Sequence, residues 1–121
     1  MRKFGRSKYG VDQTAEGRAR RTYQGRVYDS LDERRHAEQL DLDPDVVWWL
    51  RQPRFDLGED DRYAADFLVV ERNGTIYAVD VKGVETAGFR RTRKLWAKYA
   101  DIPLRVVRKG VTIDTVLPPG V

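Results

Sequence analysis

The spacing of hydrophobic and polar positions changes along the chain and predicts strands and helices in turn. Residues 76–82 are rich in β-branched and aromatic side chains, which is typical of a buried strand. Residues 86–100 instead carry apolar side chains at helical spacing, which predicts a helix with one buried face. The predicted buried face comprises Phe89, Thr92, Trp96 and Tyr99.

The remaining elements follow from the same reasoning. Ser30 begins a helix because Ser30-x-x-Glu33 matches a capping box. The predicted elements are a short strand or extended lead-in at 22–28, a helix from Ser30 to about Leu40, a strand at 46–57 interrupted at Pro53, strands at 63–71 and 75–82, the helix at 86–100, and strands at 104–108 and 111–116.

From Ser30 onward the predicted order is α-β-β-β-α-β. A hairpin followed by a strand-helix-strand crossover gives a mixed sheet flanked by helices, so the expected fold class is α/β. Residues 1–21 are polar and without a clear period, and we expect a basic flexible arm there. Residues 22–121 are expected to form a single domain.

Composition narrows the possible chemistry. The chain has no cysteine, which excludes disulfides, thiolate zinc sites and thiol catalysis. The single His36 excludes a site built from several histidines. No apolar run reaches the length of a membrane span and no signal peptide is recognisable, so a cytoplasmic location is expected.

The positive charge is concentrated at the N-terminal end. Residues 1–26 contain eight Lys or Arg residues against Asp12 and Glu16, whereas the remainder is slightly acidic. A basic arm on an acidic body indicates a polyanionic partner, most often nucleic acid, although a solvated tail has the same composition. The candidate DNA contacts are Arg18, Arg20, Arg21, Arg26, Arg90, Arg91 and Lys94.

The end of the strand at 76–82 carries the candidate chemistry. Asp80 and Lys82 project from one face because side chains alternate along a strand. Opposite charges beside apolar neighbours are costly unless a function requires them. A nuclease site requires a carboxylate that holds a metal and an ammonium beside the phosphate. A strand-end ion pair is the simpler alternative.

The hairpin register tests whether Asp66 joins this site. A two-residue Asn73-Gly74 turn would pair Arg72 with Thr75 and place Asp66 and Asp80 on opposite faces. A three-residue loop, with Gly74 in the left-handed region, places the two aspartates opposite each other. We predict the second register, in which carboxylates about 5 Å apart need a cation between them.

Asp66 followed by Asp80-Val81-Lys82 resembles the PD-(D/E)XK nuclease signature, and the element order resembles the core of that superfamily. Across residues 22–107 the spacing is similar to that of small phage-encoded nucleases of the endonuclease I type, which resolve branched DNA. Glu33 matches the acidic residue of the first helix. Ala65 stands where the signature has proline. At the position where the signature allows aspartate or glutamate, this chain has Asp80.

The resemblance implies a metal-dependent DNA endonuclease. Glu33, Asp66 and Asp80, with the Val81 carbonyl, would bind Mg²⁺ or Mn²⁺, and Lys82 would orient water or stabilise the transition state. Holliday-junction resolution would need two cuts and therefore a homodimer. The rival hypotheses are a non-catalytic nucleic-acid-binding module and an RNA-cleaving enzyme.

Several residues keep a simpler alternative. Glu33 could serve only the capping box. Trp48 and Trp49 face opposite sides of a strand, so at most one belongs to the core and the other is a candidate interface ring. Gln52 is expected to be structural, and residues 59–61, although acidic, are expected to form a solvated loop rather than a metal site.

Overall fold

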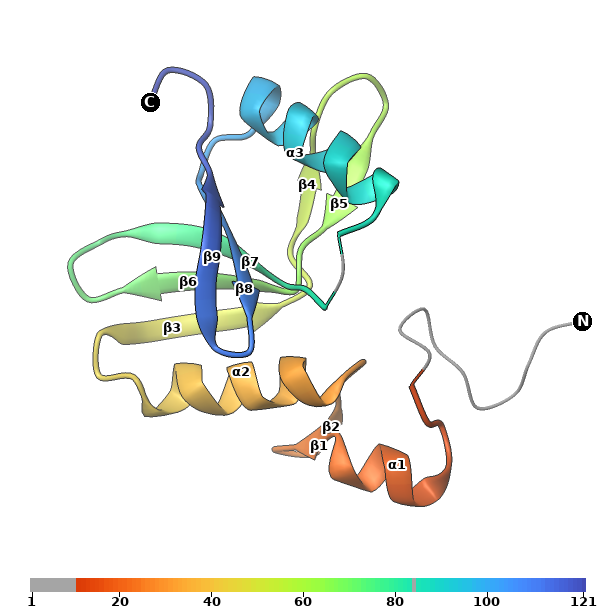
Figure 1. The fold of residues 1–121 in the computed structure, drawn as a ribbon. Helices are drawn as coiled ribbons and strands as arrows, with labels where there is room; N and C mark the ends of the chain where they lie inside the picture. The colour runs from red at the N-terminus through yellow and green to blue at the C-terminus, as the bar shows by residue number, and fades with distance from the viewer. Residues whose placement is uncertain (1–10, 84) are drawn as a thin grey trace, which may run out of the picture. The chain divides into compact units, whose positions relative to one another are not determined.

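The computed structural model describes residues 11–83 and 85–121, which fall into two compact units divided between Leu42 and Asp43 (Figure 1). The N-terminal unit contains helix α1 (Ala15–Arg20), strands β1 (Thr22–Tyr23) and β2 (Arg26–Val27), and helix α2 (Leu31–Leu42). The C-terminal unit contains the remaining elements. The division therefore falls about twenty residues later than the predicted end of the arm at residue 21.

Part of the predicted arm is helical. Thr14 caps α1 by accepting a hydrogen bond from the backbone N–H of Gly17 at 3.1 Å. Arg21, directly after the helix, is 2% exposed and donates from its guanidinium to the Tyr28 carbonyl at 2.8 Å. The prediction of a flexible arm was wrong for this segment, because its polar composition gave no sign of the helix or of the buried Arg21 that stabilises it. Residues 1–10 of the predicted arm lie outside the described part of the chain.

Helix α2 begins where the capping box predicted. Ser30 Oγ accepts a hydrogen bond from the backbone N–H of Glu33 at 3.1 Å, as the capping box requires. Glu33, Ala37 and Leu40 are the buried residues of the helix, at i, i+4 and i+7.

The C-terminal unit is built around a five-stranded mixed sheet with the order β3-β6-β7-β8-β9. Strands β7 and β8 are parallel, and the other neighbours are antiparallel. The elements are β3 (Val46–Arg51), β4 (Arg54–Asp56), β5 (Arg62–Ala64), β6 (Phe67–Glu71), β7 (Ile76–Val81), helix α3 (Ala87–Tyr99), β8 (Leu104–Arg108) and β9 (Val111–Val116). The predicted α/β class and the α-β-β-β-α-β order from α2 to β8 are confirmed, with the β4–β5 hairpin inserted between β3 and β6.

The β4–β5 hairpin continues β3 and β6 through a bend. Gln52 has φ +52°, which turns the chain before Pro53. The bend is held by backbone hydrogen bonds from Gln52 N–H to the Asp66 carbonyl at 2.9 Å and from Ala65 N–H to the Pro53 carbonyl at 3.1 Å. The predicted interruption at Pro53 is therefore present, and Gln52 has the expected structural role. The same bend places Asp66 between β5 and β6.

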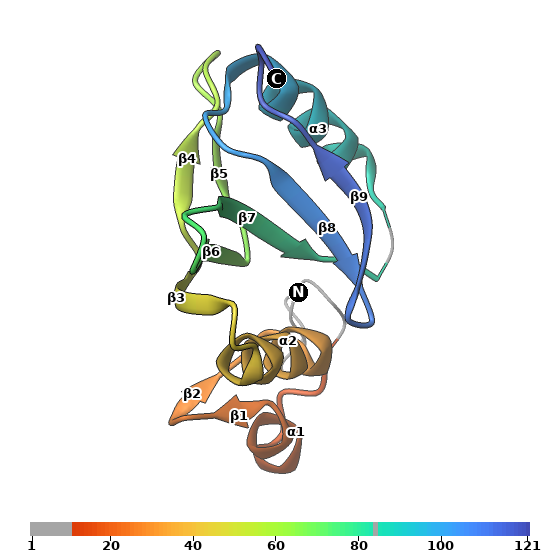
Figure 2. The same cartoon turned by 90° about the vertical axis from the view of Figure 1, so that its left-hand side faces the viewer.

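Helix α3 and the β4–β5 hairpin share one hydrophobic core with the sheet, and Figure 2 shows them at the same end of the C-terminal unit. Trp96 is fully buried, packs edge-on against Phe55 at 4.8 Å between ring centroids, and donates from Nε1 to the Ile102 carbonyl at 2.7 Å. Ala78 and Leu104 supply the sheet side of this core. Since Ala78 faces α3, Asp80 and Lys82 share that side of β7.

Candidate active site

The hairpin register brings the two aspartates together. Phe67 pairs with Val79, and the backbone N–H of Glu71 donates to the Thr75 carbonyl at 2.8 Å across the turn. Gly74 has φ +90°, in the left-handed region that favours glycine. The three-residue loop is therefore confirmed and the two-residue alternative is wrong. One step beyond the Phe67–Val79 pair, Asp66 lies beside Asp80.

Hydrogen bonds between the strands fix both carboxylates. Asp80 Oδ1 accepts from the backbone N–H of Asp66 at 3.2 Å, and Asp66 Oδ2 accepts from the backbone N–H of Val81 at 2.7 Å. Asp80 is 1% exposed and Asp66 is 9% exposed. Each strand thus holds the carboxylate of the other in a defined orientation, which is the pre-organisation that a metal site needs.

A tyrosine and a lysine complete the cluster. Tyr63, on β5, donates its hydroxyl to Asp80 Oδ2. Lys82 Nζ lies 3.9 Å from the same oxygen and 3.4 Å from the Tyr63 hydroxyl. Lys82 also lies over the Phe89 ring of α3, with Nζ 4.2 Å from its centroid. We call Tyr63, Asp66, Asp80 and Lys82 the carboxylate site.

The electrostatics of the site favour an added cation. Burial is the largest cause that raises the pKa of Asp80 to about 6, and the neighbouring Asp66 carboxylate raises it further. Lys82 and the Tyr63 hydroxyl act in the opposite direction without cancelling the rise. Two negative charges in a buried position are costly, and a divalent cation between them would remove that cost.

Glu33, the third predicted ligand, lies in the other unit. It is 4% exposed and forms part of the α2 N-terminus described above. Its convergence with Asp66 and Asp80 therefore stays a prediction. Within residues 11–83 and 85–121, no three histidine, aspartate or glutamate side chains form a group that could hold a metal ion. The candidate metal ligands that the C-terminal unit brings together are the two aspartates, Asp66 and Asp80, beside Lys82.

The predicted DNA contacts divide into exposed and buried residues. Arg18, Arg20 and Arg26 are exposed in the N-terminal unit, and Arg90, Arg91 and Lys94 are exposed on α3. Arg21 is the exception, because its buried guanidinium is bound to Tyr28 and Gln13. A side chain engaged in this way is not available to phosphate, so Arg21 leaves the proposed DNA-binding set.

Two other predictions can be compared with the structure. Trp48 is 51% exposed, whereas Trp49 is half-buried and packs edge-on against Phe67 at 5.6 Å between ring centroids. The two rings alternate across β3 as expected. Of the acidic loop at 59–61, Glu59 and Asp61 are both paired with cations of α3. The prediction of a solvated loop missed this contact.

Sequence reasoning also missed Tyr63. The residue comes three positions before Asp66, at a distance where a continuous strand would send its side chain to the other face. The bend at Ala65 and Asp66 removes that constraint and brings the hydroxyl onto Asp80. The only available signal was an aromatic residue with a polar end next to a candidate ligand.

The fold and the carboxylate site define a mixed α/β protein with two buried aspartates and a lysine on neighbouring strand ends. The chain matches the family described as "Protein of unknown function (DUF1064)" over residues 6–114 and belongs to that family. No curated protein and no solved structure matches the chain. Among the described residues, no helix combines the length and apolar character that crossing a membrane requires.

Proposed function

We propose that the protein is a metal-dependent DNA endonuclease that hydrolyses phosphodiester bonds. The observation that carries the proposal is the pairing of Asp66 with Asp80 in a buried position, with Lys82 Nζ 3.9 Å from Asp80. The α-β-β-β-α-β order supports the proposal. In the nuclease superfamily that this chain resembles, the metal ligands lie on the corresponding elements.

The donors of the site fit a hard divalent cation. Asp66 and Asp80 offer carboxylate oxygens, which Mg²⁺ and Mn²⁺ prefer, and the proposed additional ligands are the Val81 carbonyl and Glu33. When bound, the cation would lower the pKa of a water ligand and offset charge on the phosphate. Burial and, after it, repulsion from Asp66 raise the pKa of Asp80, and such a cation would offset both effects.

The side chains have distinct roles in this proposal. Asp66 and Asp80, whose carboxylates are oriented by hydrogen bonds to the facing strand, would hold the cation. Lys82 presents its ammonium to the scissile phosphate and stabilises the charge that develops there. The Phe89 ring beneath Lys82 limits where that ammonium can lie. Tyr63 positions Asp80 through its hydroxyl.

The test is a cleavage assay with purified protein on linear, nicked and branched DNA and on RNA, with and without Mg²⁺. We expect Mg²⁺-dependent cleavage of DNA that Asp80→Asn and Lys82→Ala abolish. Asp101→Asn is the matched control, because it removes one exposed carboxylate near the end of α3 and should leave cleavage unchanged. Cleavage that survives both site substitutions would refute the assignment, and binding without cleavage would favour the non-catalytic module.

The finer proposal is that the substrate is branched DNA and that the enzyme is a homodimer. Junction resolution requires two coordinated cuts, and exposed Trp48 on the edge strand β3 is the candidate contact. Sedimentation of the wild-type protein and of Trp48→Ala, alone and with a four-way junction, tests this proposal. A monomer on the junction would exclude resolution and leave the nuclease proposal intact.

A further inference from the structure

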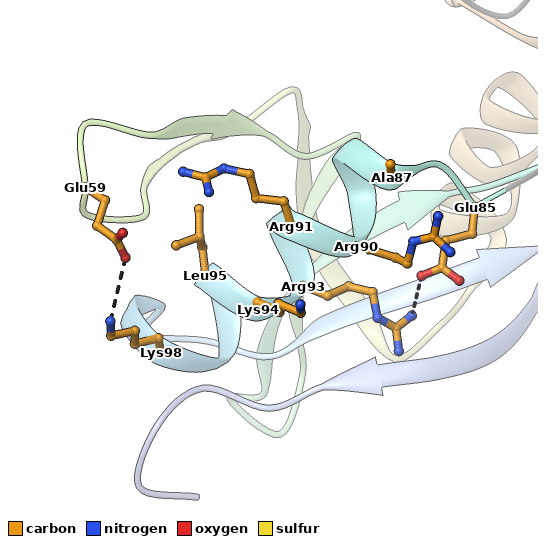
Figure 3. Close-up of a pocket in the computed structure, with 9 residues that line it drawn as sticks. All are labelled: Glu59, Glu85, Ala87, Arg90, Arg91, Arg93, Lys94, Leu95 and Lys98. Atoms are coloured by element: carbon orange, nitrogen blue, oxygen red, sulfur yellow. Dashed lines mark ion pairs between the residues drawn. The ribbon is translucent and has the colours of Figure 1, made fainter.

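The loop at the end of the β4–β5 hairpin is bound to helix α3 by charge. We call residues 57–61 the tip loop. Arg91 donates to Asp61 Oδ2 from Nη2 at 2.6 Å and from Nε at 3.0 Å. Lys98 Nζ lies 3.7 Å from Glu59 Oε2, and the Tyr99 hydroxyl donates to the same carboxylate oxygen at 3.1 Å. Figure 3 shows Glu59 facing Lys98 across the groove.

The tip loop is shaped for this contact. Gly58, Glu59 and Asp60 have φ of +72°, +49° and +60°, a conformation that is unfavourable for the two non-glycine residues. A Cβ on Gly58 would lie 3.0 Å from the Tyr99 ring, so this glycine allows the loop to approach the helix closely. Leu57, the first residue of the tip loop, packs in the hydrophobic core and is 1% exposed.

A groove of about 770 Å³ follows α3 and is lined by five basic side chains of the helix, by Glu59 of the tip loop and by Glu85, and we call it the basic groove. Figure 3 shows Arg90 and Lys94 from α3 among its lining residues. Neither has an ion pair within the described part of the chain. Arg91 and Lys98 are the two lining cations that the tip loop occupies.

One aromatic ring, Phe89, has a cation of the basic groove and the lysine of the carboxylate site near it. Lys82 lies 4.2 Å from the Phe89 centroid, and Arg93, which lines the groove, lies 5.9 Å from the same centroid. Arg93, which is itself paired with Glu85 and Asp114, and Lys82 of the carboxylate site therefore lie near the same side chain of α3. A nucleic-acid strand, which carries a phosphate at every nucleotide, matches such a series of cations better than a single small anion does.

We propose that the basic groove binds the phosphate backbone of DNA and that Glu59 and Asp61 act as a carboxylate latch on Lys98 and Arg91, which the phosphates displace. The choice of DNA rests on the proposed function. A carboxylate and a phosphate accept hydrogen bonds from arginine in the same geometry, so one can replace the other. Both ion pairs are substantially exposed, and such pairs are weak enough to exchange.

The experiment measures binding of a short fluorescein-labelled DNA duplex by the full chain in the cleavage-deficient Asp80→Asn background. Asp61→Asn and Glu59→Gln free one cation each, and each should raise affinity about two- to fivefold, the range expected for one exposed ion pair. Asp60→Asn is the matched control: it removes the same charge from the same loop, and Asp60 has no ion pair among the described residues. It should change affinity less than either of the other variants.

A second substitution separates the latch from a general effect of charge. In the Arg91→Ala background, Asp61→Asn should no longer raise affinity, because the cation that it would release is absent. An equal gain with and without Arg91, or a gain for Asp60→Asn that matches Asp61→Asn, would overturn the latch. If the wild-type protein does not cleave DNA, the proposed nuclease activity is refuted. The differences in DNA affinity between the variants still test the latch in that case. Absence of DNA binding by every variant would overturn the latch as well.

Discussion

The carboxylate site and the basic groove belong to the same unit, yet they are built from interactions of different strength. In the carboxylate site, Asp80 is 1% exposed and is held by hydrogen bonds from neighbouring strands. In the basic groove, Arg91 and Lys98 keep more than half of their side-chain surface exposed while paired. Buried polar contacts are costly to disturb, whereas exposed ion pairs exchange easily.

The difference teaches what each region can do. A buried and oriented pair of carboxylates suits a step in which atoms must be placed accurately. An exposed row of cations suits binding of a long charged partner whose contacts add up from small terms. Substitutions in the first region should therefore change rate, and those in the second should change affinity.

The largest expected effect is that of Asp80→Asn on cleavage. Loss of a charged ligand should lower the single-turnover rate by about 10³-fold or more while DNA affinity changes little. Single-turnover cleavage and fluorescence anisotropy on the same duplex measure the two quantities. A parallel loss of affinity and rate would show that Asp80 serves binding, and the comparison between the two regions would fail.

Lys82→Ala should have the second largest effect on cleavage. Removing the ammonium beside Asp80 should slow cleavage by about 10²-fold, the usual effect of losing one group that stabilises transition-state charge. Lys82→Arg keeps the charge but not the geometry and should recover only part of the rate. Full activity in Lys82→Ala would reduce this residue to an ion-pair partner of Asp80.

The pH dependence of stability tests whether burial and the Asp66 carboxylate destabilise the charged form of Asp80. Because burial and Asp66 raise the pKa of Asp80 from 3.8 to about 6, the folded state binds this proton more tightly than the unfolded chain. The stability gained from this proton is fully present below the pKa that Asp80 has in the unfolded chain. It is lost as the pH rises through the pKa that Asp80 has in the folded protein. Asp80→Asn lacks this loss.

The variant should therefore gain roughly 3 kcal/mol of unfolding free energy relative to wild type as the pH rises from about 4 to about 7. Urea unfolding of both proteins in EDTA over this range measures the difference. A difference that stays constant with pH would mean that Asp80 is not destabilised by its surroundings.

Tyr63→Phe should have a smaller effect. The variant loses the hydroxyl that donates to Asp80 Oδ2, so cleavage should slow by about tenfold and Mn²⁺ affinity should fall by about the same factor. Tyr77→Phe is the matched control, because it removes a hydroxyl that donates to Glu71 at 3.0 Å, outside the site. Equal effects of the two substitutions would show that Tyr63 matters only for stability.

Lys94→Ala should have the smallest effect and should act on affinity alone. Loss of one phosphate contact should weaken duplex binding a few-fold and reduce the slope of log affinity against log salt by about one. Lys109→Asn removes a charge from the β8–β9 turn, where φ is +48° and asparagine is tolerated, and should leave both quantities unchanged. A slowed single-turnover rate in Lys94→Ala at saturating protein would contradict the division of roles.

Local patterns were sufficient to predict much of the C-terminal unit. The strands, the helix that became α3 and the loop that sets the Asp66–Asp80 register follow from periodicity and turn chemistry, which act over a few residues. The buried face of α3 was less accurate: Tyr99 is 37% exposed, and Leu95 takes part in the core instead.

The features that sequence reasoning missed depend on contacts between distant residues. Tyr63 reaches Asp80 only because the sheet bends at Gln52, and Asp61 meets Arg91 thirty positions away. Arg21 was assigned to an exposed arm, yet it organises a small unit through carbonyl groups of residues that have no apolar pattern. No local rule predicts such contacts, because each is selected by the packing of a second element.

The burial of Trp96 provides an internal probe for these experiments. The chain has three tryptophans, and they occupy different environments: Trp96 is fully buried, Trp49 is half-buried and Trp48 is 51% exposed. Acrylamide should quench Trp48 emission readily while blue-shifted emission from Trp96 persists until the core opens. Single-tryptophan versions of the chain would thus report on the edge strand and on the core by fluorescence, without any attached dye.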